Sequence, residues 1–320
     1  MNAMRSSPDV VTFGETMALV RADQPGSLAH VTGMSLGIGG AESNVAVALR
    51  RLDISVAWVG RVGADSLGDR VVRELRAEGI DVVAVRDPDA PTGLMLKERR
   101  TQESVRVWYY RSGSAGSRLV PADLPTELIV GARLLHVTGI TPALSPTAAA
   151  ATHAAIDRAK DAGVLVSFDV NYRSTLWSSE EAGPEFRRIA ARADIIFAGD
   201  EEATIVVGAA DDPEVLLTRL ADLGPSQVIL KRGDQGCIAL VEGTRYRADA
   251  QLIRPVDTVG AGDAFVAGYL SATLRDARVD DRLDLANRVG AFACLLPGDW
   301  EGTPRLDELT LLNRVDPVSR

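Results

Sequence analysis

Lysine, histidine and cysteine are scarce in this sequence, which has three lysines, three histidines and two cysteines among 320 residues. No lysine follows a glycine, which excludes a Walker A phosphate-binding loop. No His-Arg-Asp triplet is present, which excludes a protein-kinase catalytic loop. Cys237 and Cys294 are far apart and match no metal-ligand spacing, so neither a zinc site nor a disulfide framework is expected.

Long apolar runs and excess positive charge are also missing. No apolar segment is long enough to cross a bilayer, and the first residues, MNAMRSSPD, resemble no secretory leader. Acidic residues outnumber basic ones by 44 to 35, which gives a net charge of −9 and disfavours binding to nucleic acid or anionic membranes. We therefore expect a cytoplasmic protein whose partners are small molecules.

Short β-branched segments alternate with longer segments of helical periodicity along most of the chain. The predicted strands are 10–14, 54–60, 134–139, 164–169, 194–198 and 227–231, and helical segments such as 145–162 and 213–223 separate them. Apolar strands in strand–helix–strand order predict an α/β fold, with a mostly parallel sheet covered by helices on both faces. Ligands of such sheets bind beyond the carboxyl ends of the strands.

Two stretches, 17–37 and 93–111, lack helical periodicity and are predicted to form strands and turns. The second has the pattern of a hairpin with a polar tip. The pattern is equally consistent with two arrangements: a small sheet that stands over the main domain as a lid, and an extension of the main sheet at its edge.

The segment DTVGAGDAFVAGYLSATL (257–274) carries the most specific chemical pattern. Gly260, Ala261 and Gly262 directly precede a predicted helix, where free backbone N–H groups and the helix dipole favour an anion such as a phosphoryl group. Asp263 follows, and we interpret it as the base that accepts a proton from a substrate hydroxyl, for which ordinary carboxyl acidity suffices. The structural alternative is a glycine turn with Asp263 as a helix cap.

Two further segments carry polar groups at expected strand ends. In GIGGAESNVAVALRRL (37–52), Gly39 and Gly40 allow close backbone approach and Asn44 follows just inside a helix. Glu42 stands where a dinucleotide fingerprint needs its third glycine, which excludes a Rossmann site, although a packing turn explains the glycines as well. DVNYRSTLW (169–177) offers groups for phosphate or carboxylate, or for a surface salt bridge.

The segments 39–52, 60–68 and 257–263 resemble the signatures of the ribokinase-like (PfkB) carbohydrate kinases, and the resemblance runs from about Phe13 to Pro304. The segments that resemble the 2-keto-3-deoxygluconate kinases of this family are VWYYRSGSAGS (107–117), HVTGITPALSP (136–146), DVNYRSTLW and GDWEGTP (298–304). The resemblance implies one ribokinase-like domain over residues 1–320, with three layers and a β-sheet lid. It also implies an enzyme that uses ATP and Mg²⁺.

Residue by residue, the resemblance assigns three groups of positions. The catalytic group is Gly260, Ala261, Gly262 and Asp263. The sugar-binding group is Gly40, Asn44, Tyr109, Tyr110, Arg111, Arg173, Asp263 and Asp299. The nucleotide-binding group is Asn171, Arg173, Lys231, Arg232, Gly233, Asp234, Gln235, Gly236, Gly260, Ala261, Gly262 and Asp263.

The resemblance also implies ions and assembly. Gly199-Asp200-Glu201-Glu202 stands where many members have Asn-x-x-Glu, which leaves Glu202 as the residue expected to help hold Mg²⁺. A monovalent cation such as K⁺ is expected near Asp257 and Val259, as in some relatives. Lid sheets in this family often pair between subunits, so a homo-oligomer is expected.

Three functions remain open. The leading hypothesis is phosphorylation of a primary hydroxyl of 2-keto-3-deoxygluconate, because Arg111 and Arg173 supply charge for its carboxylate and Tyr109 and Tyr110 cover a sugar face. The tyrosines are also consistent with a strand that turns one face to the core. A fructokinase is the second hypothesis, and a sugar-binding sensor without catalysis is the third.

Overall fold

The structure is a computed structural model that describes residues 7–101 and 105–313. Within these residues nine strands form the main sheet, in the order β13-β12-β11-β10-β9-β8-β1-β4-β5. Their bounds are β1 Val10–Phe13, β4 Val56–Gly63, β5 Asp81–Asp87, β8 Leu134–Thr138, β9 Leu165–Asp169, β10 Ile195–Gly199, β11 Gln227–Lys231, β12 Cys237–Val241 and β13 Thr244–Ala248. In this order the neighbouring strands from β11 to β5 all pair in parallel, whereas β12 pairs antiparallel with β11 and with β13. This confirms the mostly parallel α/β sheet.

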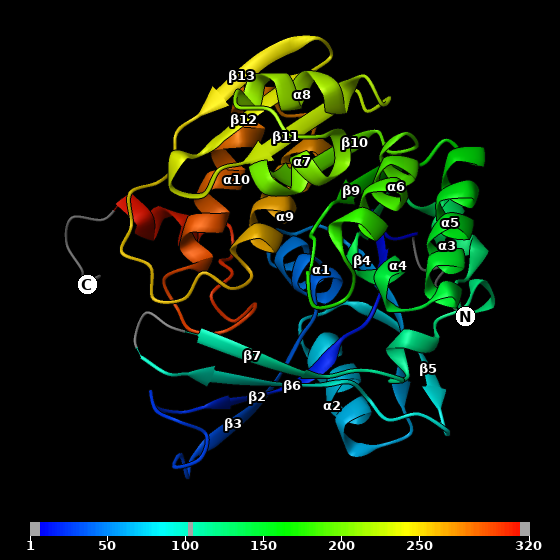
Figure 1. Cartoon of the computed structure of the whole chain (residues 1–320), viewed down its shortest axis with the longest axis vertical. Helices are drawn as coiled ribbons and strands as arrows, with labels where there is room; N and C mark the ends of the chain where they lie inside the picture. The colour runs from blue at the N-terminus through cyan, green and yellow to red at the C-terminus, as the bar shows by residue number, and fades with distance from the viewer. Residues whose placement is uncertain (1–6, 102–104, 314–320) are drawn as a thin grey trace.

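Helices cover both faces of this sheet (Figure 1). One face packs against α1 (Ala41–Arg51), α2 (Ser66–Ala77), α9 (Ala261–Leu274) and α10 (Val279–Ala293). The other packs against α3 (Thr126–Gly131), α5 (Pro146–Asp161), α6 (Ser179–Ala190), α7 (Asp200–Val207) and α8 (Pro213–Ala221), and α4 (Ile140–Leu144) follows β8. Short 3-10 helices span Gly116–Arg118, Pro121–Asp123, Gly233–Gln235 and Glu308–Asn313.

The alternation of side chains along each strand explains the two hydrophobic cores. In β10, Phe197 faces α9, and its ring centroid lies 6.5 Å from that of Phe265 and 5.4 Å from that of Tyr269. The neighbouring residues Ile196 and Ala198 lie in the core on the opposite side, with α6 and α8. Successive strand residues point to opposite faces, so strands that are apolar throughout must be buried on both sides.

The two stretches without helical periodicity form a separate sheet. Its strands are β2 Met17–Ala22, β3 Met34–Gly39, β6 Leu94–Arg99 and β7 Val105–Tyr110, in the order β3-β2-β6-β7. This sheet stands below the main body in Figure 1, so the lid is confirmed and the edge extension is excluded. Part of the expected hairpin tip, residues 102–104, lies outside the described residues.

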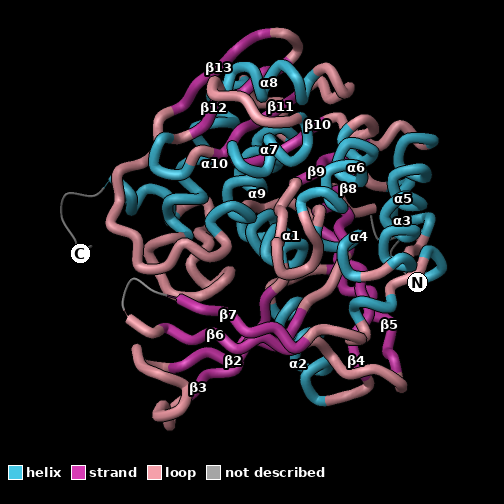
Figure 2. Tube along the Cα trace, viewed as in Figure 1, coloured by secondary structure: helices cyan, strands magenta, loops and turns pink. Residues whose placement is uncertain are grey.

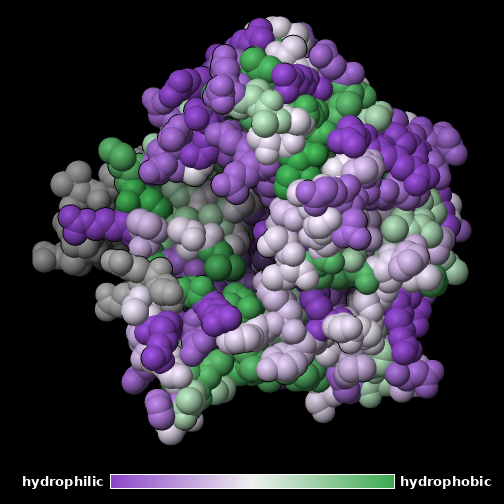
Figure 3. All heavy atoms as spheres, in the orientation of Figure 1, coloured by the Kyte–Doolittle hydropathy of each residue, from purple (hydrophilic) through white to green (hydrophobic). Residues whose placement is uncertain are grey.

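The carboxyl ends of the parallel strands, the start of α9 and the lid meet in one region. In Figure 2 loops gather there between the main sheet and the lid, and in Figure 3 the surface is hollowed at the same place. No helix within the described ranges is long and apolar enough to span a membrane.

Candidate active site

The glycine turn before α9 forms the centre of the site. Gly260 is the N-cap of α9 with φ 77°, a left-handed conformation that favours glycine. A Cβ there would overlap the carbonyl oxygen of Asp299, so the turn also needs glycine for space. The first N–H groups of a helix have no partner within it. The turn therefore leaves the N–H groups of Gly262 and Asp263 available to an anion.

Asp263 lies in the first turn of α9 and is buried, with 7% of its surface exposed. Its Oδ2 accepts a hydrogen bond from Asn44 Nδ2 at 2.8 Å, and its Oδ1 accepts one from Asn171 Nδ2 at 3.2 Å. Two side-chain amides thus fix the carboxylate in one orientation, and its side chain does not cap the helix, since Gly260 is the N-cap. Asn44 Oδ1 is itself buried without a hydrogen-bond partner among the described residues.

Burial raises the pKa of Asp263 to about 7, opposed by the hydrogen bond from Asn44 and assisted by the charge of Asp169. This differs from the ordinary acidity expected from the sequence. The physical reason is desolvation, which disfavours the charged form of a buried carboxyl group. A base with a pKa near neutral pH is well matched to proton transfer at that pH.

Lys231 brings an ammonium group to the same place. Its Nζ lies 2.7 Å and 2.9 Å from the two carboxylate oxygens of Asp169 and close to Gly262. Burial lowers the pKa of Lys231, but the carboxylates around it, Asp169 first, raise it overall, so it stays charged. Lys231 was predicted only as part of the nucleotide-binding loop; the structure places its ammonium group beside the glycine turn as well. Nearby His136 is neutral, because burial lowers its pKa to about 3.

On the lid side of Asp263 a cavity of about 80 Å³ lies between the two sheets. Among the predicted sugar-binding residues, those that line it are Gly40, Asn44, Tyr109, Arg111, Arg173, Asp263 and Asp299. A Cβ on Gly40 would overlap the carbonyl oxygen of Glu15, and one on Gly39 would lie 2.6 Å from Asp299 Oδ2. These glycines let the chain pass from β3 into α1 directly beside the cavity.

Tyr110 is the one predicted sugar-binding residue that does not line this cavity. In β7, Tyr109 faces the cavity, while Tyr110 points to the outer face of the lid with 62% of its surface exposed. Adjacent strand residues point to opposite faces, so both tyrosines could not line one cavity. Tyr110 is therefore removed from the predicted sugar site.

The two arginines of this cavity have different partners. Arg111 Nε lies 2.7 Å and its Nη2 2.6 Å from Glu15 Oε2, and Ser114 Oγ donates to the other oxygen of Glu15. Glu15 is 2% exposed, so its charge largely neutralises Arg111. Arg173 donates only to the carbonyl oxygen of Tyr172, at 3.3 Å, and has no carboxylate partner within the described ranges. Arg173 is thus the guanidinium whose charge is available to a ligand.

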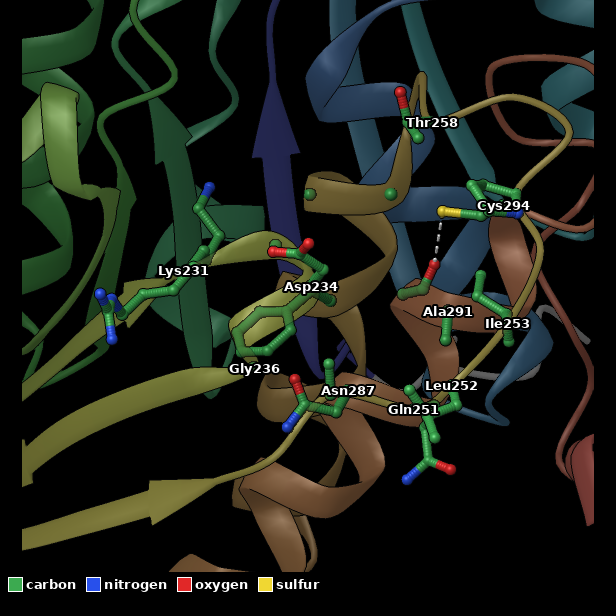
Figure 4. Close-up of a pocket in the computed structure, with 18 residues that line it drawn as sticks. Lys231, Asp234, Gly236, Gln251, Leu252, Ile253, Thr258, Asn287, Ala291 and Cys294 are labelled. Carbon is green, nitrogen blue, oxygen red and sulfur yellow. Dashed lines mark hydrogen bonds between the residues drawn. The ribbon is translucent and has the colours of Figure 1, made fainter.

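On the other side of the glycine turn lies a larger cavity of about 430 Å³ (Figure 4). Five residues of the predicted nucleotide loop line it, namely Lys231, Arg232, Gly233, Asp234 and Gly236, whereas Gln235 does not. Residues of α10 and of the loop 250–255 complete its wall, among them Asn287, Ala291, Leu252 and Ile253. Asn171 does not line it, because its amide is bound to Asp263.

Comparison with known proteins gives the chain its family. The pattern of the pfkB family carbohydrate kinases matches residues 7–305. The chain belongs to the pfkB family. It is 38% identical to 2-dehydro-3-deoxygluconokinase of Bacillus subtilis over 306 residues, 94% of each chain, and 34% identical to probable fructokinase-5 of Arabidopsis thaliana, over 94% of this chain and 96% of the relative. The crystal structure of a PfkB protein from Polaromonas sp. JS666 superposes with a TM-score of 0.84 at 36% identity, covering 92% of this chain and 98% of that one.

As a pfkB family kinase, the protein is an ATP-dependent sugar kinase. Some residues of its site carried no signal in the sequence. Glu15 follows a buried strand without any motif, and Lys97 was noted only for the scarcity of lysine. Both come from segments more than 80 residues away from their partners Arg111 and Asp257. Only the tertiary structure brings them together.

Glu202, the predicted metal ligand, is engaged with the main chain. Its Oε2 accepts a hydrogen bond from the N–H of Gly199 at 2.7 Å, and its Oε1 accepts one from the N–H of Tyr172 at 2.9 Å. Within the described ranges no three His, Cys, Asp or Glu side chains are grouped to hold a metal. This arrangement fits Mg²⁺ that is bound largely by nucleotide phosphates and water, as is usual for this ion.

Proposed function

We propose that the protein transfers the γ-phosphoryl group of ATP to a primary hydroxyl group of 2-keto-3-deoxygluconate. The observation that carries this proposal is the position of Asp263. It lines the sugar-side cavity together with Arg173, while Ala261 and Gly262, directly before it in the chain, line the larger cavity. A sugar that carries a carboxylate group would give Arg173 a negatively charged partner, which it lacks among the described residues.

The proposed reaction uses Asp263 as general base. The substrate hydroxyl oxygen attacks the γ-phosphorus, the bond from this phosphorus to the β,γ-bridging oxygen breaks, and ADP leaves with the bond's electrons. The hydroxyl proton passes to Asp263, and the N–H groups of the turn and Lys231 neutralise the oxygens of the phosphoryl group. Mg²⁺, which the phosphates of the nucleotide and Glu202 would hold, would supply further positive charge.

The sugar side of the proposal has chemical support from three groups. Tyr109 presents its ring and hydroxyl to the cavity, Asp299 offers a carboxylate to sugar hydroxyl groups, and the unpaired Asn44 Oδ1 can accept a hydrogen bond from one. Arg173 is suited to a carboxylate because its planar guanidinium can donate two parallel hydrogen bonds. The relative from Bacillus subtilis carries the name of this activity.

A neutral ketose such as fructose is the second candidate. The observation in its favour is the pairing of Arg111 with Glu15, because it leaves one guanidinium where the sequence expected two. Relatives named as fructokinases have identities close to that of the first relative.

A panel of sugars separates the candidates. ADP release is measured with 2-keto-3-deoxygluconate, fructose and neutral hexoses, each with saturating MgATP. The proposal expects the highest kcat/KM for the sugar acid. A clear preference for fructose would reject it in favour of the second candidate. Tight sugar binding without ADP release would support a sensor.

We also infer that two copies of the chain associate through the outer face of the lid. Val20, Leu36, Leu96 and Trp108 are paired in one row across the four lid strands on this face. Leu36 is 38% exposed and Trp108 is 41% exposed, which is typical of a surface that another protein covers. Apolar groups gather over the lid in Figure 3.

Sedimentation of the wild-type protein should show a dimer, and the substitution Leu36→Asp should dissociate it. A monomeric wild type would contradict the inference.

A further inference from the structure

A buried ammonium group joins the lid to both halves of the site. Lys97 projects from lid strand β6 toward the main body, and its side chain is 6% exposed. Its Nζ lies 2.8 Å from Asp257 Oδ2 and 3.2 Å from Asp299 Oδ1. The three charged groups come from positions 97, 257 and 299, so no local sequence pattern relates them.

Each carboxylate of this cluster supports a different part of the site. Asp257 is the first residue of the segment that forms the glycine turn, and its Oδ1 accepts a hydrogen bond from the N–H of Val259 at 3.2 Å. Asp299 lines the sugar-side cavity, and its carbonyl oxygen lies against Gly260. A displacement of either carboxylate therefore moves the phosphate-binding turn or a wall of the sugar site.

The surroundings of Asp257 are rich in donors rather than acceptors. Its Oδ2 accepts hydrogen bonds from Lys97 and from the N–H of Gly298 at 3.3 Å, in addition to the contact of Oδ1 with Val259. The carbonyl oxygen of Cys294 accepts from the N–H groups of Val256 and Asp257. A metal cation needs oxygen atoms that are free to coordinate it. The residues around Asp257 therefore do not fit the monovalent cation that the family resemblance implies there.

The charges of the cluster show what Lys97 supplies. Two buried carboxylates with no cation between them would be strongly destabilising, because burial removes the water that screens their repulsion. Burial raises the pKa of Asp299, and the charge and the hydrogen bond of Lys97 oppose this rise. Lys97 is the only lysine or arginine among the described residues that forms a salt bridge with Asp257 or Asp299.

We propose that Lys97 is a built-in cation of this kinase: its ammonium neutralises Asp257 and Asp299, holds the glycine turn and the sugar-site carboxylate in place, and removes the need for a bound monovalent cation. Lys97 acts through these two residues and is a positioning residue. The proposal rests on the sugar-kinase function proposed above.

The first test needs no variant. Turnover of the full-length protein is measured in potassium, sodium and tetramethylammonium chloride at equal ionic strength, and thermal unfolding is followed in the same solutions without substrate. If Lys97 is the built-in cation, turnover and melting temperature should each be the same in all three salts. A fall in turnover of about tenfold or more without potassium, or a rise in melting temperature specific to potassium, would overturn the proposal.

The second test replaces the ammonium. Lys97→Met should lower kcat and kcat/KM for the sugar by about 10- to 100-fold, the range expected when reacting groups are displaced by about 1 Å. Lys97→Arg should restore part of the loss, because it keeps the charge. The matched control is Lys160→Met, which removes a 40%-exposed lysine paired with Asp194 and should change neither constant.

Two further measurements keep the outcomes separate. If Lys97→Met does not fold, the double variant Lys97→Met with Asp257→Asn removes one charge of each sign and should fold with the same loss of turnover. Potassium should raise the melting temperature of Lys97→Met above its value in tetramethylammonium, since the freed carboxylates then attract a cation. Unchanged kinetics in Lys97→Met would contradict the proposal. Failure to phosphorylate any sugar would reject the proposed function, whereas the melting temperatures would still test Lys97.

Discussion

The nucleotide side and the sugar side of the site are built in different ways. The nucleotide side is a cavity of about 430 Å³ lined mostly by glycine, alanine and larger apolar residues of the main body. The sugar side is a cavity of about 80 Å³ whose lining includes the aromatic residue Tyr109 and the charged residues Glu15, Arg111, Arg173, Asp263 and Asp299. Its charged groups are paired across the boundary of the lid, as in Glu15–Arg111 and Lys97–Asp299.

This difference indicates where specificity resides. Backbone N–H groups and a helix dipole recognise any phosphate, so the nucleotide side depends on glycine and on space. Recognition of a particular sugar depends on which charged side chains are left without a charged partner, and among the described residues Arg173 has none. Substitutions on the two sides should therefore fail in different ways.

The largest effect is expected at Asp263, which lines the sugar-side cavity directly after the glycine turn. Asp263→Asn removes the base but keeps the size of the side chain, so kcat should fall by about 10²- to 10⁴-fold while sugar and ATP still bind. Turnover and ligand affinity are measured separately, and Asp284→Asn on the exposed side of α10 is the control. Near-normal turnover in Asp263→Asn would show that this carboxylate is not the base.

On the nucleotide side, one added methyl group at Gly260 should be enough to lower kcat. Gly260→Ala places a Cβ against the carbonyl oxygen of Asp299 in a left-handed conformation, so kcat should fall by about 100-fold through displacement of the turn. Gly243→Ala is the matched control: Gly243 has φ 79° with no atom within 4 Å of the added Cβ, so it should lose only about 1 kcal/mol of stability. Equal kinetic effects in the two variants would show that space at Gly260 is unimportant.

On the sugar side, replacement of Arg173 should weaken sugar binding, whereas replacement of Arg111 should lower the stability of the protein. Arg173→Met should raise KM for the sugar acid by about 10- to 100-fold, the effect of losing a charge-assisted hydrogen bond, and leave the free energy of unfolding nearly unchanged. Arg111→Met leaves the buried Glu15 without its partner and should lower the free energy of unfolding by about 3–5 kcal/mol. Kinetics and urea unfolding of both variants test this. Similar behaviour of the two would contradict the distinction.

The smallest effect is expected from pH. Because the pKa of Asp263 is raised to about 7, kcat/KM for the sugar should fall about tenfold per pH unit below that value, as the base becomes protonated. Asn44→Ala removes a hydrogen bond that lowers this pKa and should shift the profile to higher pH, whereas ionisation of ATP would leave it in place. An unshifted profile would assign the titration to the nucleotide.

The raised pKa of Asp263 also makes the stability of the protein depend on pH. The folded protein keeps the proton of Asp263 up to about pH 7, whereas the unfolded chain releases it near 3.8. The contribution of this group to stability is therefore complete below pH 3.8 and is lost as the pH rises to about 7. Asp263→Asn removes this dependence, so above pH 7 the variant should be at least as stable as the wild type in thermal unfolding.

Sequence reasoning succeeded where the information is local. The strands that it predicted, 134–139, 164–169, 194–198 and 227–231, are β8 to β11, and the turn at Gly260 precedes a helix as expected. It did not predict β5, which is one edge of the sheet, or β12 and β13, which follow β11 without an intervening α-helix. It also placed Tyr110 with Tyr109, because a motif does not show which face of a strand meets the ligand.

The amino-acid sequence by itself determined the alternating elements, the glycine turn with Asp263, and through them the family and the type of reaction. These features depend on residue type and on neighbours within a few positions, because helix periodicity, strand alternation and backbone conformation are local properties. The tertiary structure alone decided which charges are neutralised: Arg111 by Glu15, and Asp257 and Asp299 by Lys97. Burial, which raises the pKa of Asp263, is likewise a property of the folded chain, because it depends on segments that the sequence keeps far apart.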